Sequence, residues 1–253
     1  NIKHKVWLKE LLFLTYPQAK FSLPEIFQDN ESPFLGTINI DGSKIKIFGG
    51  FGDLQTALYG SEINNNQICI NIGTGSQVLA ICDKKFIPHH PIDMKPFFGK
   101  FIKSITHIPA GRSFNYLNEN IFNDNNLWQK LSSINLDSIK HKNKQNFDLN
   151  IFPTNWRYDP QNIITIKEAF NNDSNFYNLL LNNFCLEYTH ALSILDKKSE
   201  YKKLLLSGGR LKDIPYVNNF FKEIYGSDSI SSNTHIILDE TIMGLDKLSK
   251  HLY

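Results

Sequence analysis

The sequence predicts an α/β domain built on a mixed β-sheet with helices on both faces. Two strand pairs joined by tight turns occupy the first third of the chain, at residues 37–48 and 67–82. In the last third, between residues 175 and 252, apolar runs with helical spacing alternate with short strand-like runs. Hairpins pair antiparallel, whereas strands separated by helices pair in parallel, so the two patterns together indicate a mixed sheet.

The two hairpins are marked by their turns. Residues 37–48 read TINIDGSKIKIF, two alternating strands around Asp41-Gly42, and that dipeptide favours a hairpin because its turn needs residues that tolerate positive φ. Residues 67–71 and 77–82 are β-rich runs on either side of the turn at 72–76. We expect this second hairpin to pair behind the first.

A helix is expected between the two hairpins. Residues 53–59, DLQTALY, follow a glycine-rich segment and are good helix material. Asp53 stands where it can cap the N-terminus of this helix, and Gly60 ends it.

Strands and helices then alternate to the end of the chain. Residues 96–109 form an aromatic and β-branched stretch. Residues 123–150 are polar and contain the basic run 140–144, so we expect a surface excursion there. The remaining expected elements are helices at 111–122, 175–195, 211–225 and 240–252, and strands at 203–207 and 235–238.

Composition narrows the class of protein. The chain has 253 residues, 41% of them hydrophobic, which is enough for a sizeable core. Its net charge of +2 gives no overall attraction to nucleic acid or to an anionic membrane. The cysteines, Cys69, Cys82 and Cys185, lie in apolar stretches without metal-site spacing, as is typical of buried thiols in a reducing compartment. We therefore expect a cytoplasmic protein with no nucleic-acid or membrane partner.

Three glycine-marked turns follow predicted strands, at residues 49–53, 72–76 and 207–210. Glycine allows the backbone to approach a ligand and to offer its N–H groups to phosphate oxygens, and hydroxyls such as those of Thr74 and Ser76 add donors. One such turn is explained by a plain hairpin or by a strand-to-helix crossing. Three in one chain favour a phosphate-binding site.

The motifs resemble those of a known family. Four segments are similar to the C-terminal half of FGGY-family carbohydrate kinases: GGFGDLQTALYGS at 49–61, NIGTGSQVLAI at 71–81, SGGRLKDIP at 207–215 and ETIMGL at 240–245. Residues 52–55 and 96–112 are most similar to its sedoheptulokinase-like branch. The resemblance implies an actin-like, RNase H-like ATPase domain for residues 37–253, with residues 1–36 forming the end of a preceding domain and a linker.

The resemblance also implies a catalytic base. Asp53 corresponds to the family's base, which takes the proton from the attacking sugar hydroxyl, and Gly52 and Gln55 accompany it as substrate-binding residues. From the residues alone, Asp53 is also explained as a helix cap. Gln55 could orient the base or face the core.

Two further motifs correspond to nucleotide contacts. Gly73, Thr74, Gly75 and Ser76 correspond to the family's second phosphate motif, which approaches the β- and γ-phosphates of ATP. The adenosine motif corresponds to Gly208, Gly209, Arg210 and Asp213. Arg210 stands where the family usually has a small residue, and Asp213 where Asn or Ser is common.

The implied activity is transfer of the γ-phosphoryl group of ATP, with Mg²⁺, to a hydroxyl of a ketose such as sedoheptulose. The family's first phosphate motif, an acidic-Gly-Thr hairpin that helps to hold Mg²⁺, has no counterpart here, because Asp41-Gly42-Ser43 is a hairpin turn. We therefore predict no metal ligand in this chain, an N-terminal kinase domain as its partner beside sugar and nucleotide, and an inactive isolated chain. The alternative is a non-catalytic nucleotide- or partner-binding module of the same fold.

Overall fold

The computed structural model describes residues 7–27, 31–83, 86–134, 147–154, 156–172, 175–232 and 240–252. Its centre is a six-stranded sheet in the order β5-β6-β4-β3-β7-β8. Strands β5, β6, β4 and β3 pair antiparallel, whereas β7 pairs in parallel with both β3 and β8. The predicted mixed sheet is confirmed. Its strands are β3 (Gln67–Ile72), β4 (Ser76–Cys82), β5 (Asp93–Phe97), β6 (Lys100–Ile108), β7 (Lys203–Ser207) and β8 (Ile230–Ser232).

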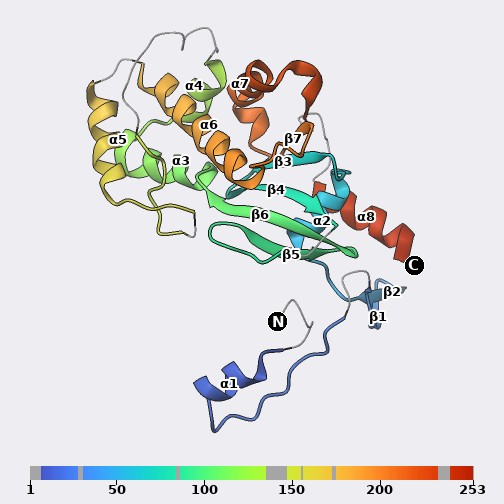
Figure 1. The fold of residues 1–253 in the computed structure, drawn as a ribbon. Coiled ribbons are helices and arrows are strands. Elements are labelled where there is room, and N and C mark those ends of the chain that lie inside the picture. The colour runs from blue at the N-terminus through green and yellow to red at the C-terminus, as the bar shows by residue number, and fades with distance from the viewer. Residues whose placement is uncertain are drawn as a thin grey trace.

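Helices cover both faces of this sheet, as expected (Figure 1). One face carries α2 (Asp53–Gly60) and α8 (Glu240–Leu252), which lie against each other. The other face carries a larger layer: α3 (Gly111–Leu117), η1 (Asn118–Phe122), α4 (Leu127–Ser133), α5 (Gln161–Asn172), α6 (Phe176–Leu195), η3 (Leu211–Asp213), α7 (Pro215–Tyr225) and η4 (Ser227–Ser229).

The side chains of β3 show how the sheet divides the core. Ile68, Ile70 and Ile72 point into the large core beneath α6, whereas Cys69 points into the smaller core beneath α2 and packs with Leu58. This alternation follows from the period of two residues in a strand. Burial raises the pKa of the Cys69 thiol.

The three cysteines form no disulfide in the part of the chain that the structure describes. All three are free thiols. Cys69 and Cys185 are buried and Cys82 is half-buried.

The first hairpin forms, but it does not join the main sheet. Strands β1 (Phe34–Ile40) and β2 (Ser43–Phe48) pair around Asp41 and Gly42, which have the positive φ angles that the sequence predicted. They make a separate two-stranded sheet, so the expected pairing between the two hairpins is wrong. The reason is the short glycine-rich connection, which runs from β2 directly into α2 on the face of the large sheet and leaves the hairpin beyond its edge (Figure 1).

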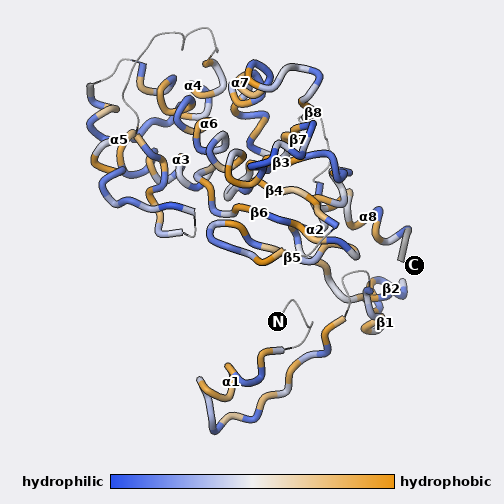
Figure 2. The backbone as a smooth tube through the Cα atoms, viewed as in Figure 1, coloured by the Kyte–Doolittle hydropathy of each residue, from blue (hydrophilic) through white to orange (hydrophobic). Residues whose placement is uncertain are grey.

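The hairpin and the N-terminal helix expose much apolar surface. Helix α1 (Lys9–Thr15) has no buried residue, and its Leu14 is exposed. Leu35 of the hairpin is exposed as well. Figure 2 shows hydrophobic stretches along the segment from α1 to the β1–β2 hairpin, which extends away from the sheet. Exposed apolar side chains that gather on one segment are suited to contact with another surface.

One expectation for the middle of the chain needs correction. Residues 123–150 are not only a surface excursion, because Leu127 and Leu131 of α4 are buried and Phe147 and Leu149 return to the core. Tertiary packing here overrides the polar composition. The basic run 140–144 lies outside the described residues.

The C-terminal third follows the predicted order with one break. The helix expected at 211–225 is divided into η3 and α7, because Pro215 occupies the first turn of α7 and cannot continue the preceding helical hydrogen bonds. The strand expected at 235–238 lies outside the described residues. A strand that was not predicted, β8, adds to the edge of the sheet next to β7.

A buried carboxylate fixes the segment that precedes α5 to the helical layer. Glu187 of α6 is 6% exposed. Its Oε2 accepts hydrogen bonds from Asn150 Nδ2 at 3.0 Å and Trp156 Nε1 at 3.1 Å, and its Oε1 accepts one from Arg157. Arg157 also pairs with Asp148 at 3.2 Å. One acidic side chain therefore satisfies donors from three positions of a loop.

We expect Glu187→Gln to lower the free energy of unfolding by about 2–3 kcal/mol, because the neutral amide accepts fewer hydrogen bonds and leaves buried donors unpaired. Chemical denaturation measures the change. Glu200→Gln is the matched control, since Glu200 is exposed and pairs with Lys103 only at 4.0 Å; it should stay within about 0.5 kcal/mol of the parent. Equal effects of the two substitutions would contradict a structural role for the Glu187 network.

Candidate functional site

A pocket of about 480 Å³ lies where the carboxyl ends of β3 and β7 meet the first turns of α2 and α8. Open α/β sheets bind ligands beyond the carboxyl ends of their strands. Parallel pairing puts Asn71 of β3 beside Ser207 of β7, so the turns that follow these strands share one edge. The pocket brings together six of the predicted site residues: Asp53, Gly73, Gly75, Ser76, Gly208 and Gly209.

Asp53 enters this pocket from the start of α2. Gly52, not Asp53, is the N-cap residue, so the predicted capping position is corrected by one residue. The exposed carboxylate of Asp53 accepts a hydrogen bond from the Leu54 N–H through Oδ1 at 2.7 Å. Its Oδ2 has no hydrogen-bond partner among the residues described, so one carboxylate oxygen is available to a ligand.

Gln55 and Gly52 lie beside the pocket and do not line it. The Gln55 side-chain oxygen occupies the space that a Cβ atom on Gly52 would need. The Gly52 carbonyl accepts hydrogen bonds from the Thr56 N–H at 2.9 Å and the Thr56 hydroxyl at 2.8 Å. Neither of the two possibilities left open for Gln55, a contact with Asp53 or a place in the core, appears in the described contacts.

The turn at residues 73–75 is held by the start of α3. The Gly111 N–H donates to the Gly73 carbonyl at 3.2 Å, and the Arg112 N–H donates to the Thr74 carbonyl at 2.9 Å. Thr74 and Gly75 are exposed. Within the described part of the chain, the N–H groups of Thr74 and Gly75 have no partner. Fixed carbonyls and free amides are the arrangement that binds an anion.

Ser76, which follows this turn, is anchored in the protein interior. Its side chain is buried, and its Oγ lies 3.1 Å from the Ile108 carbonyl oxygen and 2.7 Å from Tyr188 Oη. Tyr188, buried in α6, also donates to the Pro109 carbonyl at 2.9 Å. The Ser76 hydroxyl thus has two protein partners, and its predicted contact with ATP stays a prediction.

The two glycines after β7 differ in what the fold requires of them. Gly208 has a φ of +106°, and a Cβ atom there would overlap the backbone of Ile72. Gly209 has no atom within 4 Å of the place where its Cβ would lie. Packing therefore explains Gly208, whereas Gly209 is free to face a ligand in the pocket.

This difference predicts opposite outcomes for two adjacent substitutions. Gly208→Ala should cost about 2–4 kcal/mol of stability, because it combines an unfavourable φ with a backbone overlap. Gly209→Ala should keep stability within about 0.5 kcal/mol and weaken nucleotide binding by roughly tenfold. Thermal unfolding and nucleotide titration measure the two effects. Equal loss of stability in both variants would show that Gly209 is a packing glycine.

Arg210 and Asp213 lie outside the lining of this pocket. They form an ion pair at 3.1 Å, and the Arg210 guanidinium lies 4.4 Å from the centre of the Trp128 ring. The two predicted adenosine contacts are thus engaged with each other and with an aromatic ring.

Glu240 is a pocket residue to which no role was assigned from the sequence. Its Oε1 accepts a hydrogen bond from Ser207 Oγ at 2.8 Å, and Ser207 Oγ accepts one from Asn71 Nδ2 at 3.0 Å. This chain of bonds joins β3, β7 and α8 at the edge of the pocket. The sequence contained one signal, since Glu240 begins the ETIMGL segment, but nothing in it showed that α8 starts beside Asp53.

Two glycines bring α2 and α8 together. A Cβ atom on Gly244 would overlap the Thr56 carbonyl, and one on Gly60 would overlap the Glu240 carbonyl. Such a close crossing requires glycine on both helices. It also aligns the two helices so that both of their first turns line the pocket.

The carboxylates available to a Mg²⁺ ion that arrives with a nucleotide are those of Asp53 and Glu240. Nucleotide-bound Mg²⁺ takes most of its ligands from phosphate and water and needs only one or two carboxylates. Across the described ranges, no three His, Cys, Asp or Glu side chains form a metal-binding group. The pocket fits a metal held mainly by the nucleotide and does not form a closed metal site.

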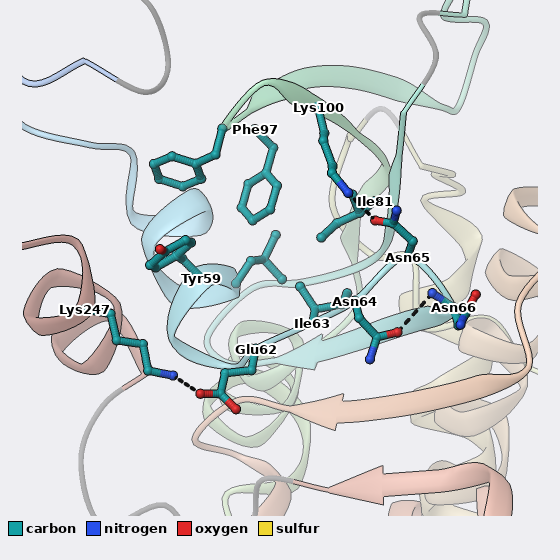
Figure 3. Close-up of a pocket in the computed structure, with 12 residues that line it drawn as sticks. Tyr59, Glu62, Ile63, Asn64, Asn65, Asn66, Ile81, Phe97, Lys100 and Lys247 are labelled. Carbon is teal, nitrogen blue, oxygen red and sulfur yellow. Dashed lines mark hydrogen bonds and ion pairs between the residues drawn. The ribbon is translucent and has the colours of Figure 1, made fainter. Parts of the chain in front are cut away.

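A second pocket, of about 730 Å³, lies farther along α2 (Figure 3). Tyr59 and Phe97 flank it, and ion-paired Glu62 and Lys247 lie at its side. It is larger than the first pocket, but it contains none of the predicted site residues. Its charged groups are engaged with protein partners, so the first pocket is the better candidate site.

No protein-family model matches the sequence, and no curated protein matches it. Among the helices that the structure describes, none has both the length and the apolar character needed to cross a membrane.

Solved structures do resemble the chain. Xylulose kinase from Lactobacillus acidophilus aligns with a TM-score of 0.66 at 15% identity, over 100% of this chain and 53% of its own. Gluconate kinase from the same organism aligns with a TM-score of 0.68 at 16% identity, over 100% of this chain and 53% of its own. Plasmodium falciparum glycerol kinase with ADP aligns with a TM-score of 0.55 at 15% identity, over 89% of this chain and 49% of its own. The likeness confirms the predicted fold class, the actin-like ATPase fold, and the chain spans about half the length of each neighbour.

Proposed function

We propose that the chain is the nucleotide-side domain of an ATP- and Mg²⁺-dependent carbohydrate kinase, which transfers the γ-phosphoryl group to a hydroxyl of a ketose such as sedoheptulose. One observation carries the proposal. A single pocket is lined by a carboxylate with an unpartnered oxygen, Asp53, and by the glycines of two turns, 73–75 and 208–209, of which the first offers unpartnered amides within the described residues.

Each part of the pocket has a place in phosphoryl transfer. The Thr74 and Gly75 amides stabilise the charge that builds on the transferring phosphoryl group. Asp53 accepts the proton of the attacking sugar hydroxyl, a contribution of roughly 10²–10⁴-fold in rate. The first turns of α2 and α8 add favourable N-terminal dipoles near the phosphates. Mg²⁺, held mainly by the nucleotide, would neutralise phosphate charge.

The sugar side of the site belongs to a further domain in this proposal. The structural neighbours are about twice as long as the chain, and the exposed apolar surface of α1 and the β1–β2 hairpin is suited to contact with another domain. In the division proposed from the sequence, residues 1–36 end that domain and connect it to residues 37–253.

Nucleotide binding tests the proposal for this chain. We expect ATP and ADP to bind the 253-residue chain with a Kd weaker than about 1 μM, because half of the phosphate contacts are absent. Titration followed by NMR chemical shifts measures it, with adenosine as a phosphate-free control. Nanomolar binding would reveal further phosphate contacts, and no binding at millimolar ATP would overturn the proposal.

Phosphoryl transfer tests the activity in the complete protein that contains this chain. A panel of sedoheptulose, xylulose, gluconate and glycerol, with ATP and Mg²⁺, should give one clearly preferred acceptor. Turnover of none of them would favour the alternative, a non-catalytic binding module.

The contacts of Arg210 support that alternative. Its guanidinium is stacked on Trp128 and paired with Asp213, so two side chains that the family resemblance assigns to adenosine are engaged with protein partners instead. Arg210→Gly separates the two functions: improved ATP binding without a gain in turnover would support the non-catalytic module.

A further inference from the structure

His107 has an unusual backbone conformation at the edge of the candidate site. Ser76 of β4 pairs with Ile108 of β6, and Gln77 pairs with Thr106, so His107 has no partner on β4 and forms a β-bulge. Its φ angle is +64°. Glycine usually occupies the left-handed position of such a bulge. A histidine there is strained, and strain of this kind gathers at functional sites.

The bulge places His107 beside the turn at residues 73–75. His107 is exposed, whereas the three residues that follow it, 108–110, are buried. The first pocket described above adjoins a smaller one of about 140 Å³, and two of the described residues line both of them, Gly75 and His107. Gly75 carries one of the unpartnered amides of the turn.

The imidazole is also oriented. Thr106 Oγ1 lies 2.9 Å from His107 Nδ1. With the Thr106 hydroxyl as donor to Nδ1, the ring proton of a neutral imidazole is on Nε2. Among the residues described, Nε2 has no hydrogen-bond partner. In this tautomer Nε2 is a donor without a protein partner, on a residue that lines the same pocket as Gly75.

We propose that His107 contacts the phosphate groups of the bound nucleotide through Nε2 and is a nucleotide-binding residue of this site. The inference rests on the proposed function. Two carboxylates, those of Asp53 and Glu240, line the same pocket and repel a polyanion. His107 and Lys95 line it too, and their hydrogen-bond donors offset this repulsion.

The test is His107→Gly, with ATP, ADP and adenosine titrated into the 253-residue chain by NMR. Glycine accepts the positive φ, so the melting temperature should stay equal or rise. ATP and ADP affinity should fall by roughly tenfold, the effect of losing one hydrogen bond to a charged group, and adenosine affinity should not change. Ser199→Gly is the matched control, since Ser199 is exposed with a φ of +52° outside both pockets; it should leave all three affinities unchanged.

The outcomes separate the two proposals. Unchanged ATP affinity in His107→Gly, or an equal loss of ATP and adenosine affinity, would overturn the role of His107 and leave the proposed function standing. A parent chain that binds none of the three ligands would overturn both. His107→Asn, which also tolerates a positive φ, should partly retain ATP affinity because its amide is a shorter donor.

Discussion

Asp53→Asn is expected to lower kcat by roughly 10²–10⁴-fold with an almost unchanged melting temperature. Asn keeps the size of the side chain and an oxygen that can accept from the Leu54 N–H, which Asp53 Oδ1 contacts at 2.7 Å. It removes the oxygen that can accept a proton. The expected loss therefore lies in turnover, and the apparent affinity for ATP should change little.

The measurement must use the complete protein, because the sugar side lies outside this chain in our proposal. Sugar phosphorylation and thermal unfolding are compared for the same variant. A role limited to the helix N-terminus predicts the opposite pattern, a loss of about 0.3–1 kcal/mol in stability with turnover nearly intact. Turnover within about threefold of the parent would show that Asp53 is not the base.

The sequence predicted those parts of the fold that depend on local chemistry. The turn at Asp41-Gly42, the helix that begins at Asp53 and the strand β3 follow from positive φ, helix propensity and β-rich composition, and they were placed to within a few residues. The first hairpin was assigned to the wrong sheet because pairing between distant strands depends on the connection that leads out of β2. A local pattern does not contain that information.

The same distinction applies to the site. The three glycine turns were visible as motifs. Parallel pairing of β3 and β7 explains why the turns at 72–76 and 207–210 share one pocket, which the glycines at 49–52 do not line. Glu240 and His107 were missed for different reasons. Glu240 reaches the pocket only through the crossing of α8 with α2, and His107 through a bulge between β4 and β6. Both features depend on contacts between distant segments.

Gly244→Ala is expected to lower the free energy of unfolding by about 3 kcal/mol, near the upper end of the usual range for overpacking. Helix propensity alone predicts the opposite, because alanine stabilises a helix interior by about 1 kcal/mol over glycine. The overlap with backbone atoms outweighs helix propensity, so the substitution should lower stability. A Cβ atom on Gly244 meets the Thr56 carbonyl, which belongs to the backbone of α2 and cannot move aside as a side chain can.

Gly60→Ala tests the same contact from the other helix, and Ser249→Ala, on the exposed side of α8, is the control that should change stability by less than about 0.5 kcal/mol. Chemical denaturation gives the three free energies. Because the crossing aligns the first turns of α2 and α8, any Gly244→Ala protein that remains folded should also bind ATP less tightly, as these two helix N-termini are displaced from the pocket they line. A gain in stability would mean that the two helices do not approach as closely as their glycines indicate.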